Sequence, residues 1–102
     1  MSLSIKGKIY STFHFVGIFG SGMSAVAQYL KWNSMDITGS DRSLNSVDTD
    51  SIQKKLTSIG CRIFPQDGSG ITENTSAIVL SSAIEDSNPD FQQAKKLNIP
   101  VF

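Results

Sequence analysis

The sequence predicts an α/β domain with a doubly wound parallel sheet of five strands in the order 3-2-1-4-5. Short apolar segments alternate along the chain with segments of helical periodicity, and this alternation favours parallel strands joined by helices. Residues 13–16 and 77–80 are rich in large apolar side chains, as expected of strands buried on both faces. Closely spaced glycines follow the first of these segments, so the chain turns sharply there from a strand into a helix.

Length and composition limit the classes of protein to which this chain can belong. The 102 residues, of which 39% are hydrophobic and 18% charged, fit one small domain with a single core. The net charge is zero and the basic residues are scattered, which argues against a nucleic-acid partner. No apolar segment approaches the roughly 20 residues that span a bilayer, so we expect no membrane partner. The single cysteine, Cys61, is expected to be a buried thiol, which fits a reducing cytoplasm.

The first 11 residues show no clear pattern and are interpreted as an N-terminal extension whose first residues could stem from cloning. The domain itself is expected to span residues 12–102, with its first strand at 12–16. Asn33, which readily adopts the left-handed conformation, is expected to end the helix that follows the glycines. The apolar side chains of this helix share one face, and they are Met23, Val26, Ala27 and Leu30.

The second strand is predicted at residues 36–40, and a polar loop follows it. The next helix is expected to begin near Asp48 to Asp50, which supply capping oxygens, and to end at Gly60. Strand 61–64 and a turn at 65–70 come next. The apolar face of this second helix consists of Ile52, Leu56 and Ile59.

The last part of the chain supplies two further strands and a helix. Residues 71–74 are expected to form a single helical turn before the buried strand at 77–80. Another helix is predicted to start near Ser87, with Pro89 at its first position. Residues 99–102 are predicted as the fifth strand, at the sheet edge because the proline within it has no N–H for the ladder.

The glycine turn after the first strand is the principal candidate for a binding site. Glycine allows backbone N–H groups to approach a ligand, and the helix that follows points its N-terminus at the same place. The turn therefore predicts a site for a phosphate or diphosphate. The usual dinucleotide fingerprint has glycines at the first, third and sixth positions, which here are Gly17, Phe19 and Gly22. Gly20 could replace part of the missing middle glycine, and the alternative is a glycine turn without a ligand.

Polar residues follow two other predicted strands at the same edge of the sheet. Asp41 comes after the second strand, where nucleotide-binding βαβ units place an acidic residue against a ribose or base; alternatively, it only starts a turn. Ser81 and Ser82 follow the fourth strand. Strands 1 and 4 flank the point at which the strand order reverses, and ligands of open α/β sheets bind there. The three features thus converge on one crevice.

These residues resemble the N-terminal, Rossmann-like domain of the Mur ligases of peptidoglycan synthesis, most closely the type that ligates L-alanine to UDP-N-acetylmuramate. The glycine turn that continues into Met-Ser and the Ser-Ser-Ala-Ile segment are both fairly specific to this family. The matching segments are residues 14–18, 20–24, 39–41, 60–64, 81–84, 88–89 and 99–101.

The resemblance implies that the domain binds the UDP part of UDP-N-acetylmuramate or a related UDP-muramoyl ligand. The diphosphate would lie on the glycine turn and the nucleoside toward Asp41. Two departures stand out: Phe19 replaces a family glycine and would obstruct the diphosphate unless its ring points away, and Pro65-Gln66 replaces Gly-His, so that a polar contact could be lost. The implied substrate-binding residues are Gly17, Phe19, Gly20, Ser21, Gly22, Met23, Ser24, Ser40, Asp41, Ser81, Ser82 and Ala83.

The resemblance also implies ATP and Mg²⁺ for a full-length ligase, whose central ATPase and C-terminal domains are missing from this sequence. A lysine-bearing phosphate loop, a catalytic triad and a metal-ligand cluster are not found in it. His14, the single histidine, lies within a predicted strand and is expected to be packed or hydrogen-bonded rather than a general base. The chain is therefore interpreted as a substrate-binding domain with no cofactor or catalytic residue of its own. The alternative is a regulatory Rossmann domain that senses NAD(P) or another nucleotide.

Overall fold

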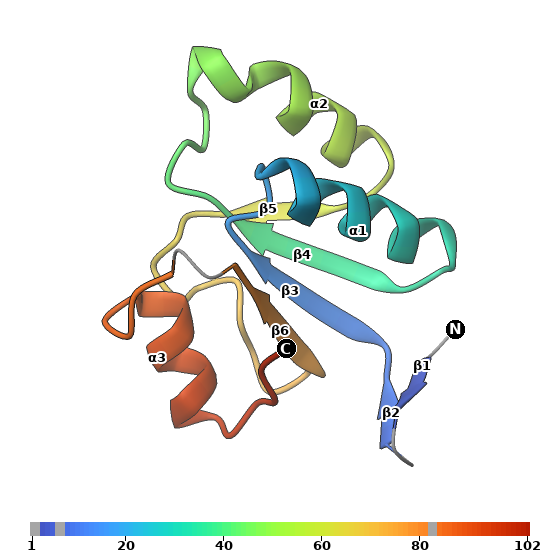
Figure 1. Cartoon of the computed structure of the whole chain (residues 1–102), viewed down its shortest axis with the longest axis vertical. Helices are drawn as coiled ribbons and strands as arrows, with labels where there is room; N and C mark the ends of the chain where they lie inside the picture. Colours follow the sequence, from blue (N-terminus) through green and yellow to red (C-terminus); the bar gives the residue numbers. More distant parts are fainter. Residues whose placement is uncertain (1–2, 6–7, 82–83) are drawn as a thin grey trace.

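A computed structural model describes residues 3–5, 8–81 and 84–102. Its main sheet has four parallel strands in the order β5-β4-β3-β6 (Figure 1). In chain order this is 3-2-1-4, so the doubly wound arrangement is confirmed for four strands. The strands are β3 (Thr12–Val16), β4 (Asp36–Ser40), β5 (Arg62–Phe64) and β6 (Ala77–Leu80).

The fifth strand was wrongly predicted. Residues 99–102 contribute only an isolated parallel bridge between Val101 and Ile78. The backbone N–H of Ile78 donates to the carbonyl of Pro100 at 2.9 Å, and the N–H of Phe102 donates to the carbonyl of Ile78 at 2.9 Å. Because Pro100 has no N–H to donate to β6, the segment lies along β6 with this single bridge and no ladder.

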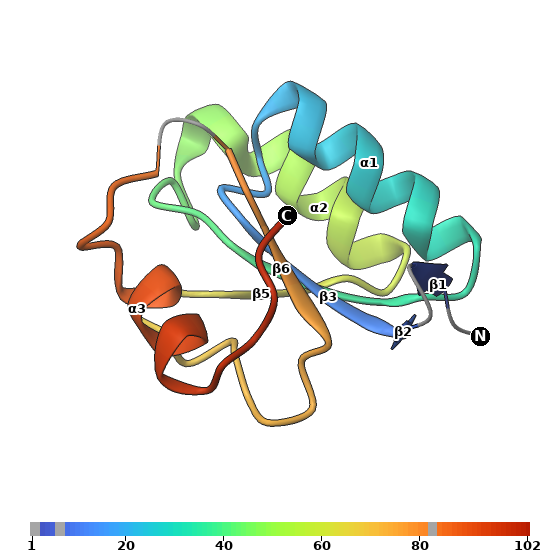
Figure 2. The ribbon, with the colours of Figure 1, turned by 60° about the horizontal axis from the view of Figure 1, so that its bottom comes forward.

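Helices cover both faces of the sheet (Figure 2). The helices α1 (Ser21–Trp32) and α2 (Asp50–Ser58) pack on one face, and α3 (Pro89–Lys96) packs on the other. The larger core cluster lies under α1 and α2 and joins Phe15 of β3 to Ala27 and Leu56 of the two helices. The smaller cluster lies under α3 and includes Ile78, Ala94 and Ile99. Burial of these side chains is the main favourable term in the folding free energy.

Residues 1–11, expected to lack a pattern, contain an antiparallel hairpin of β1 (Leu3–Ile5) and β2 (Lys8–Tyr10). It is a sheet separate from the main one and lies beyond the first residue of β3 (Figure 1). Strands of three residues are too short to show an alternating pattern in the sequence.

The helix boundaries were largely predicted, and the exceptions concern single residues. Val26 is 49% exposed, so the apolar face of α1 consists of Met23, Ala27 and Leu30 without it. Asn33 caps the C-terminus of α1, but Ser34, with φ of 67°, has the left-handed conformation. The side-chain amide of Asn33 donates instead to the carbonyl of Tyr29 at 2.8 Å, which ends the helix without a positive φ at the asparagine.

Two local predictions were wrong for reasons of hydrogen bonding. The aspartates near residue 48 do not cap α2; Ser46 accepts from the N–H of Asp48 at 3.3 Å and begins the 3-10 helix η1 (Val47–Thr49) that leads into α2. Residues 71–74 form no helical turn. Instead, the N–H of Thr75 donates to the carbonyl of Thr72 at 3.0 Å and closes a single turn that is not helical.

Cys61 is buried as predicted, and burial raises the pKa of its thiol although nearby Lys31 opposes the shift.

Candidate functional site

The parallel register places the ends of three strands side by side. Val16 of β3 pairs with Ser40 of β4 on one side and with Leu80 of β6 on the other. The residues that follow these ends, among them Gly17 and Asp41, therefore leave the sheet at one edge. The predicted convergence of the glycine turn with the end of the second and fourth strands is confirmed for the backbone.

The glycine turn is closed by hydrogen bonds within the protein. Gly17 has a φ of +83°, a conformation that side chains other than glycine rarely adopt. Its N–H and that of Ile18 both donate to the carbonyl of Ser40, at 2.8 and 3.0 Å. The N–H of Gly20 donates to the carbonyl of Gly17 at 3.1 Å. These N–H groups are thus already satisfied and are not free donors for a phosphate.

Asp41 starts a turn, which is one of the two roles that the sequence left open, and it also binds the glycine turn; its contact with a ribose or base stays a prediction. One carboxylate oxygen, Oδ2, accepts from the N–H of Phe19 at 3.0 Å, so Asp41 binds the glycine turn directly. The other, Oδ1, accepts from the N–H of Ser43 at 2.9 Å and starts the turn after β4. All four N–H groups from Gly17 to Gly20 therefore have internal acceptors. The expectation that the turn presents free N–H groups to a diphosphate is therefore wrong for residues 17–20.

The free donors lie at the first turn of α1. Its N-cap residue is Gly20, which has no side chain to accept a hydrogen bond, and the first turn contains no acidic residue. Among the described residues, none accepts a hydrogen bond from the N–H groups of Ser21, Gly22 or Met23. A Cβ atom added to Gly22 would meet no atom within 4 Å, so the space beside this turn is open. An anion could bind these donors and the positive end of the helix dipole.

A cavity of about 280 Å³ lies at this edge of the sheet. It contains two of the predicted site residues, Gly17 and Asp41, and four residues that sequence reasoning missed. Its lining residues are Gly17, Asp41, Arg42, Ser43, Gln66 and Ile84. A larger cavity of about 410 Å³ is lined by residues such as Thr12, Asp36 and Arg62, which begin their strands, and by none of the predicted site residues.

The remaining predicted residues lie outside the cavity lining. The ring of Phe19 is partly buried, packs against the larger core cluster and does not line the cavity, which favours the interpretation in which it points away from the crevice. Met23 packs against the same cluster, and the buried Ser24 donates its hydroxyl to the carbonyl of Ser21 at 3.2 Å. Ser81 is half-buried and does not line the cavity. Ser82 and Ala83 lie outside the described residues.

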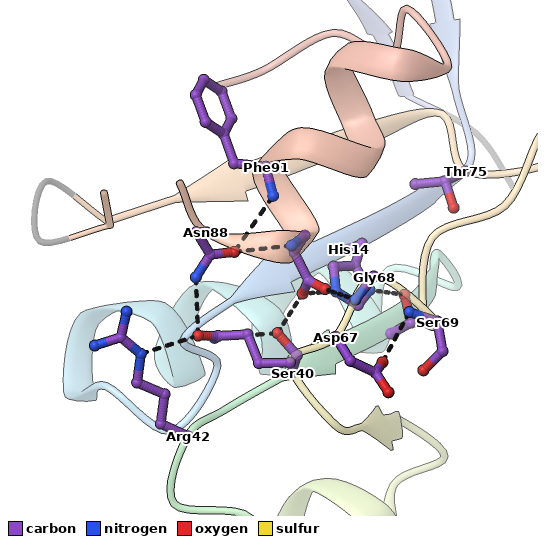
Figure 3. A network of polar contacts seen from close by, with 12 residues as sticks. His14, Ser40, Arg42, Asp67, Gly68, Ser69, Thr75, Asn88 and Phe91 are labelled. Atoms are coloured by element: carbon purple, nitrogen blue, oxygen red, sulfur yellow. Dashed lines mark hydrogen bonds and ion pairs between the residues drawn. The ribbon is translucent and has the colours of Figure 1, made fainter. Parts of the chain in front are cut away.

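Ser40 is fully buried and belongs to a polar network under α3 rather than to the cavity wall (Figure 3). Its hydroxyl donates to Oδ2 of Asp90 at 2.5 Å, and Nε2 of His14 lies 2.9 Å from the same oxygen. The other ring nitrogen of His14, Nδ1, lies 2.7 Å from the hydroxyl of Thr38. His14 is therefore packed and hydrogen-bonded as predicted. Asp90, at the start of α3, was missed by sequence reasoning.

Asp90 is completely buried, yet it is satisfied on both oxygens. Its Oδ1 accepts from the N–H of Gly68 at 2.7 Å. Burial alone would raise the pKa of the Asp90 carboxyl, but the hydrogen bonds from His14, Ser40 and the Gly68 N–H outweigh it and hold the pKa below its usual range. The carboxylate is thus charged at neutral pH and holds β3, β4 and α3 together.

Gln66 connects this network to the cavity. Its Nε2 donates to the hydroxyl of Ser40 at 3.2 Å, and its Oε1 accepts from Nδ2 of Asn88 at 2.9 Å and from Nε of Arg42 at 3.3 Å. Gln66, which replaces the family histidine, thus makes three hydrogen bonds within the protein, and the expected loss of a polar contact near the site stays a prediction. Arg42 in turn forms an exposed ion pair with Glu85 at 3.0 Å.

No group of three His, Cys, Asp or Glu side chains among the described residues could hold a metal ion. The described part of the chain also has no helix long and apolar enough to cross a bilayer. The donors and acceptors at the carboxyl edge of the sheet are suited to binding, with an anion at α1 and a polar group at Asp41.

A doubly wound sheet with a glycine turn after its first strand, an open helix N-terminus and an acidic residue after its second strand is typical of Rossmann-like α/β domains. The model of the Mur ligase family, catalytic domain, matches residues 12–102. The chain therefore belongs to the Mur ligase family, as the sequence predicted.

The relatives and solved structures agree with this assignment. The UDP-N-acetylmuramate--L-alanine ligase of Vesicomyosocius okutanii is 42% identical over 101 residues, which are 99% of this chain and 20% of that protein. The same ligase of Ruthia magnifica is 43% identical over 88 residues, which are 86% of this chain and 18% of that protein. The crystal structure of UDP-N-acetylmuramate-alanine ligase from Thermotoga maritima matches with a TM-score of 0.77 and 29% identity, covering 90% of this chain and 20% of that one. The chain thus spans about a fifth of the length of the curated relatives it matches.

Proposed function

We propose that this chain is the N-terminal domain of a Mur-type peptidoglycan ligase and that it binds the UDP part of UDP-N-acetylmuramate. The observation that carries the proposal is the open N-terminus of α1 beside a cavity at the carboxyl edge of the sheet. Anions bind helix N-termini, and ligands of doubly wound sheets bind at this edge. The relatives are named for ligating UDP-N-acetylmuramate, which carries a diphosphate and a nucleoside.

The size of the cavity supports a placement of the nucleoside in the cavity and of the diphosphate at the first turn of α1. A cavity of about 280 Å³ lies just below the range of about 300 to 1,000 Å³ in which drug-sized ligands bind. It suits a nucleoside rather than a whole UDP-sugar, so the sugar extends out of it. The Asp41 carboxylate lines the cavity and has lone pairs beyond those used by Phe19 and Ser43, so it accepts from a ribose hydroxyl or a base N–H. The diphosphate then reaches the N–H groups of Ser21, Gly22 and Met23.

Ligation itself belongs to parts of the ligase outside this chain. ATP-dependent activation of a carboxylate needs cationic groups and Mg²⁺ to stabilise the transferring phosphoryl group. This sequence contains no lysine-bearing phosphate loop, so we expect ATP and Mg²⁺ to bind outside it. This domain supplies substrate binding and orientation, and the missing central and C-terminal domains supply catalysis.

Isothermal titration of the 102-residue chain with UDP-N-acetylmuramate, UDP, uridine and NAD⁺ tests the proposal. We expect UDP-N-acetylmuramate and UDP to bind, and NAD⁺ not to bind. Asp41→Ala should weaken UDP-N-acetylmuramate binding about tenfold, the scale of one hydrogen bond to a charged group. The matched control is Asp36→Ala, which removes an exposed carboxylate from the opposite end of the same strand. Binding of NAD⁺ in preference to UDP would favour the nucleotide-sensing alternative and contradict the proposal.

A further inference from the structure

Arg42 is the only cationic residue among the described residues that line the cavity. It follows β4 directly after Asp41, and its side chain is 61% exposed. A guanidinium carries five N–H donors in a fixed plane. One of them donates to Gln66 and another to Glu85, so three donors remain for a ligand. Arginine is suited to phosphate because two of its parallel donors can bind two oxygens of one group.

The orientation of Arg42 is determined by a series of hydrogen bonds that begins at α3. The N–H of Asp90 donates to Oδ1 of Asn88 at 2.9 Å, so the Asn88 amide nitrogen must face the other way. That nitrogen donates to Oε1 of Gln66, which fixes the Gln66 oxygen on the side of Arg42. The Gln66 nitrogen then donates to Ser40. Each group in this series has one possible direction, so Gln66 presents an acceptor to Nε of Arg42.

Glu85 occupies the outer side of the guanidinium. Its Oε2 lies 3.0 Å from an Arg42 terminal nitrogen, and both side chains are more than half exposed, at 61% and 59%. Exposed ion pairs contribute little to stability because water screens them. A ligand anion can therefore replace the Glu85 carboxylate at little cost, while the hydrogen bond from Nε to the Gln66 oxygen, at 3.3 Å, continues to orient the guanidinium.

We propose that Arg42 binds a phosphate of the nucleoside diphosphate ligand, that Glu85 competes with this phosphate for the guanidinium, and that Gln66 is a positioning residue for Arg42. The inference rests on the proposed function and deepens it, because it assigns the preference for a nucleoside diphosphate over the free nucleoside to a side chain. The nucleoside lies in the cavity with Asp41, and its phosphates leave the cavity between Arg42 and the first turn of α1.

Titration of the 102-residue chain with UDP and with uridine tests the inference. Arg42→Gln should weaken UDP binding about tenfold and leave uridine binding unchanged. Glu85→Gln should tighten UDP binding by about twofold to threefold, because it removes the competing carboxylate. Arg62→Gln is the matched control, since Arg62 lies on β5 and lines the other cavity; it should change neither affinity.

Gln66→Ala separates positioning from a structural role. We expect it to reduce the ratio of UDP to uridine affinity, whereas a structural role alone would lower the melting temperature and leave the ratio unchanged. The inference is overturned if Arg42→Gln binds UDP like the wild type, if it weakens uridine equally, or if Glu85→Gln weakens UDP. A wild-type chain that binds neither UDP nor uridine would instead overturn the proposed function, and the inference with it.

Discussion

The N-termini of α1 and α3 lie on opposite faces of the same sheet and differ in how their N–H groups are satisfied (Figure 2). At α3, Asn88 caps the helix by accepting from the N–H groups of Asp90 and Phe91, and the charged Asp90 lies in the first turn. At α1, the cap is Gly20, and no side chain accepts from the first turn among the described residues. Both helices carry the same dipole, but only α3 satisfies it within the protein.

Because of this difference, the N-terminus of α3 contributes to the stability of the fold and that of α1 is available for ligand binding. A helix N-terminus whose N–H groups are capped by a side chain contributes to the free energy of folding but has no free N–H donors for a ligand. A helix start that is left open forgoes the stabilisation of a cap and keeps donors for an anion. In this domain the first arrangement fixes the sheet under α3, and the second lies at the cavity edge. Changes at the two helices should therefore affect different measurements.

The largest effect is expected from removing the carboxylate at α3. Asp90→Ala leaves His14, Ser40 and the Gly68 N–H without their shared acceptor inside the protein. Loss of one partner of a buried pair costs about 3 to 5 kcal/mol of unfolding free energy. Urea denaturation measures it, and Asp86→Ala, which changes an exposed aspartate just before the same helix, is the control. A loss below about 1 kcal/mol would show that the network does not stabilise the fold.

The same carboxylate should make stability depend on pH. Because the folded-state pKa of Asp90 is lowered, its contribution is present above the unfolded-state pKa of about 3.9 and is lost as pH falls through the folded-state pKa. The difference in unfolding free energy between wild type and Asp90→Asn should be constant above about pH 5 and shrink below about pH 4. Hydrogen bonds to Ser69 also lower the pKa of Asp67, but both proteins share this group and it cancels. A difference that grew on acidification would contradict the assignment.

The comparison can be sharpened by giving α1 a cap like that of α3. Gly20 has φ of −61° and ψ of 144°, which any residue can adopt, and an added Cβ would lie 3.4 Å from the nearest atom, the carbonyl oxygen of Gly17. Gly20→Asp should raise the unfolding free energy by a few tenths to about 1 kcal/mol. It should weaken UDP binding by about tenfold or more, because its carboxylate occupies the donors meant for the phosphates.

Gly20→Ala is the control for this change. It adds a Cβ without a carboxylate, so UDP affinity should remain near that of the wild type while the unfolding free energy falls slightly. Equal UDP affinity in Gly20→Asp and the wild type, measured by titration calorimetry, would place the anion away from α1.

The smallest effect on UDP binding is expected at Phe19, whose ring packs against the core beneath α1 and α2. Phe19→Leu keeps an apolar side chain of similar size and should cost less than about 1.5 kcal/mol of unfolding free energy. UDP affinity should stay the same, because the ring does not line the cavity. Tighter UDP binding by the variant would mean that the ring obstructs the diphosphate after all.

Most of the fold could be predicted because its signals are local. β3, β4 and β6 were predicted with their bounds, since turn residues and segments of helical periodicity flank them, and Pro89 indicated the start of α3. The sequence could not show that residues 99–102 form only a bridge. Their pairing depends on which backbone N–H and carbonyl groups of β6 are free to bond with the residues beside Pro100. The exposure of Val26 likewise depends on which side of α1 meets the sheet.

The candidate site was predicted only where topology determines it. The position of Asp41 beside the glycine turn follows from the order of parallel strands. The role of Asp90 does not, because its burial arises from contact with His14, 76 residues away. A signal was nevertheless present: the polar side chains of His14, Thr38 and Ser40 lie on one face of neighbouring strands, and a buried polar face needs a partner.

The separation between His14 and Asp90 also constrains how the chain assembles during synthesis. The ribosome releases His14 76 residues before its acceptor, so the α3 face of the sheet cannot close until α3 has emerged. The opposite face needs Phe15, Ala27 and Leu56, all made earlier, and can collapse first. A product that stops before Asp90 therefore lacks both the acceptor that His14 and Ser40 share and the helix that covers this face of the sheet.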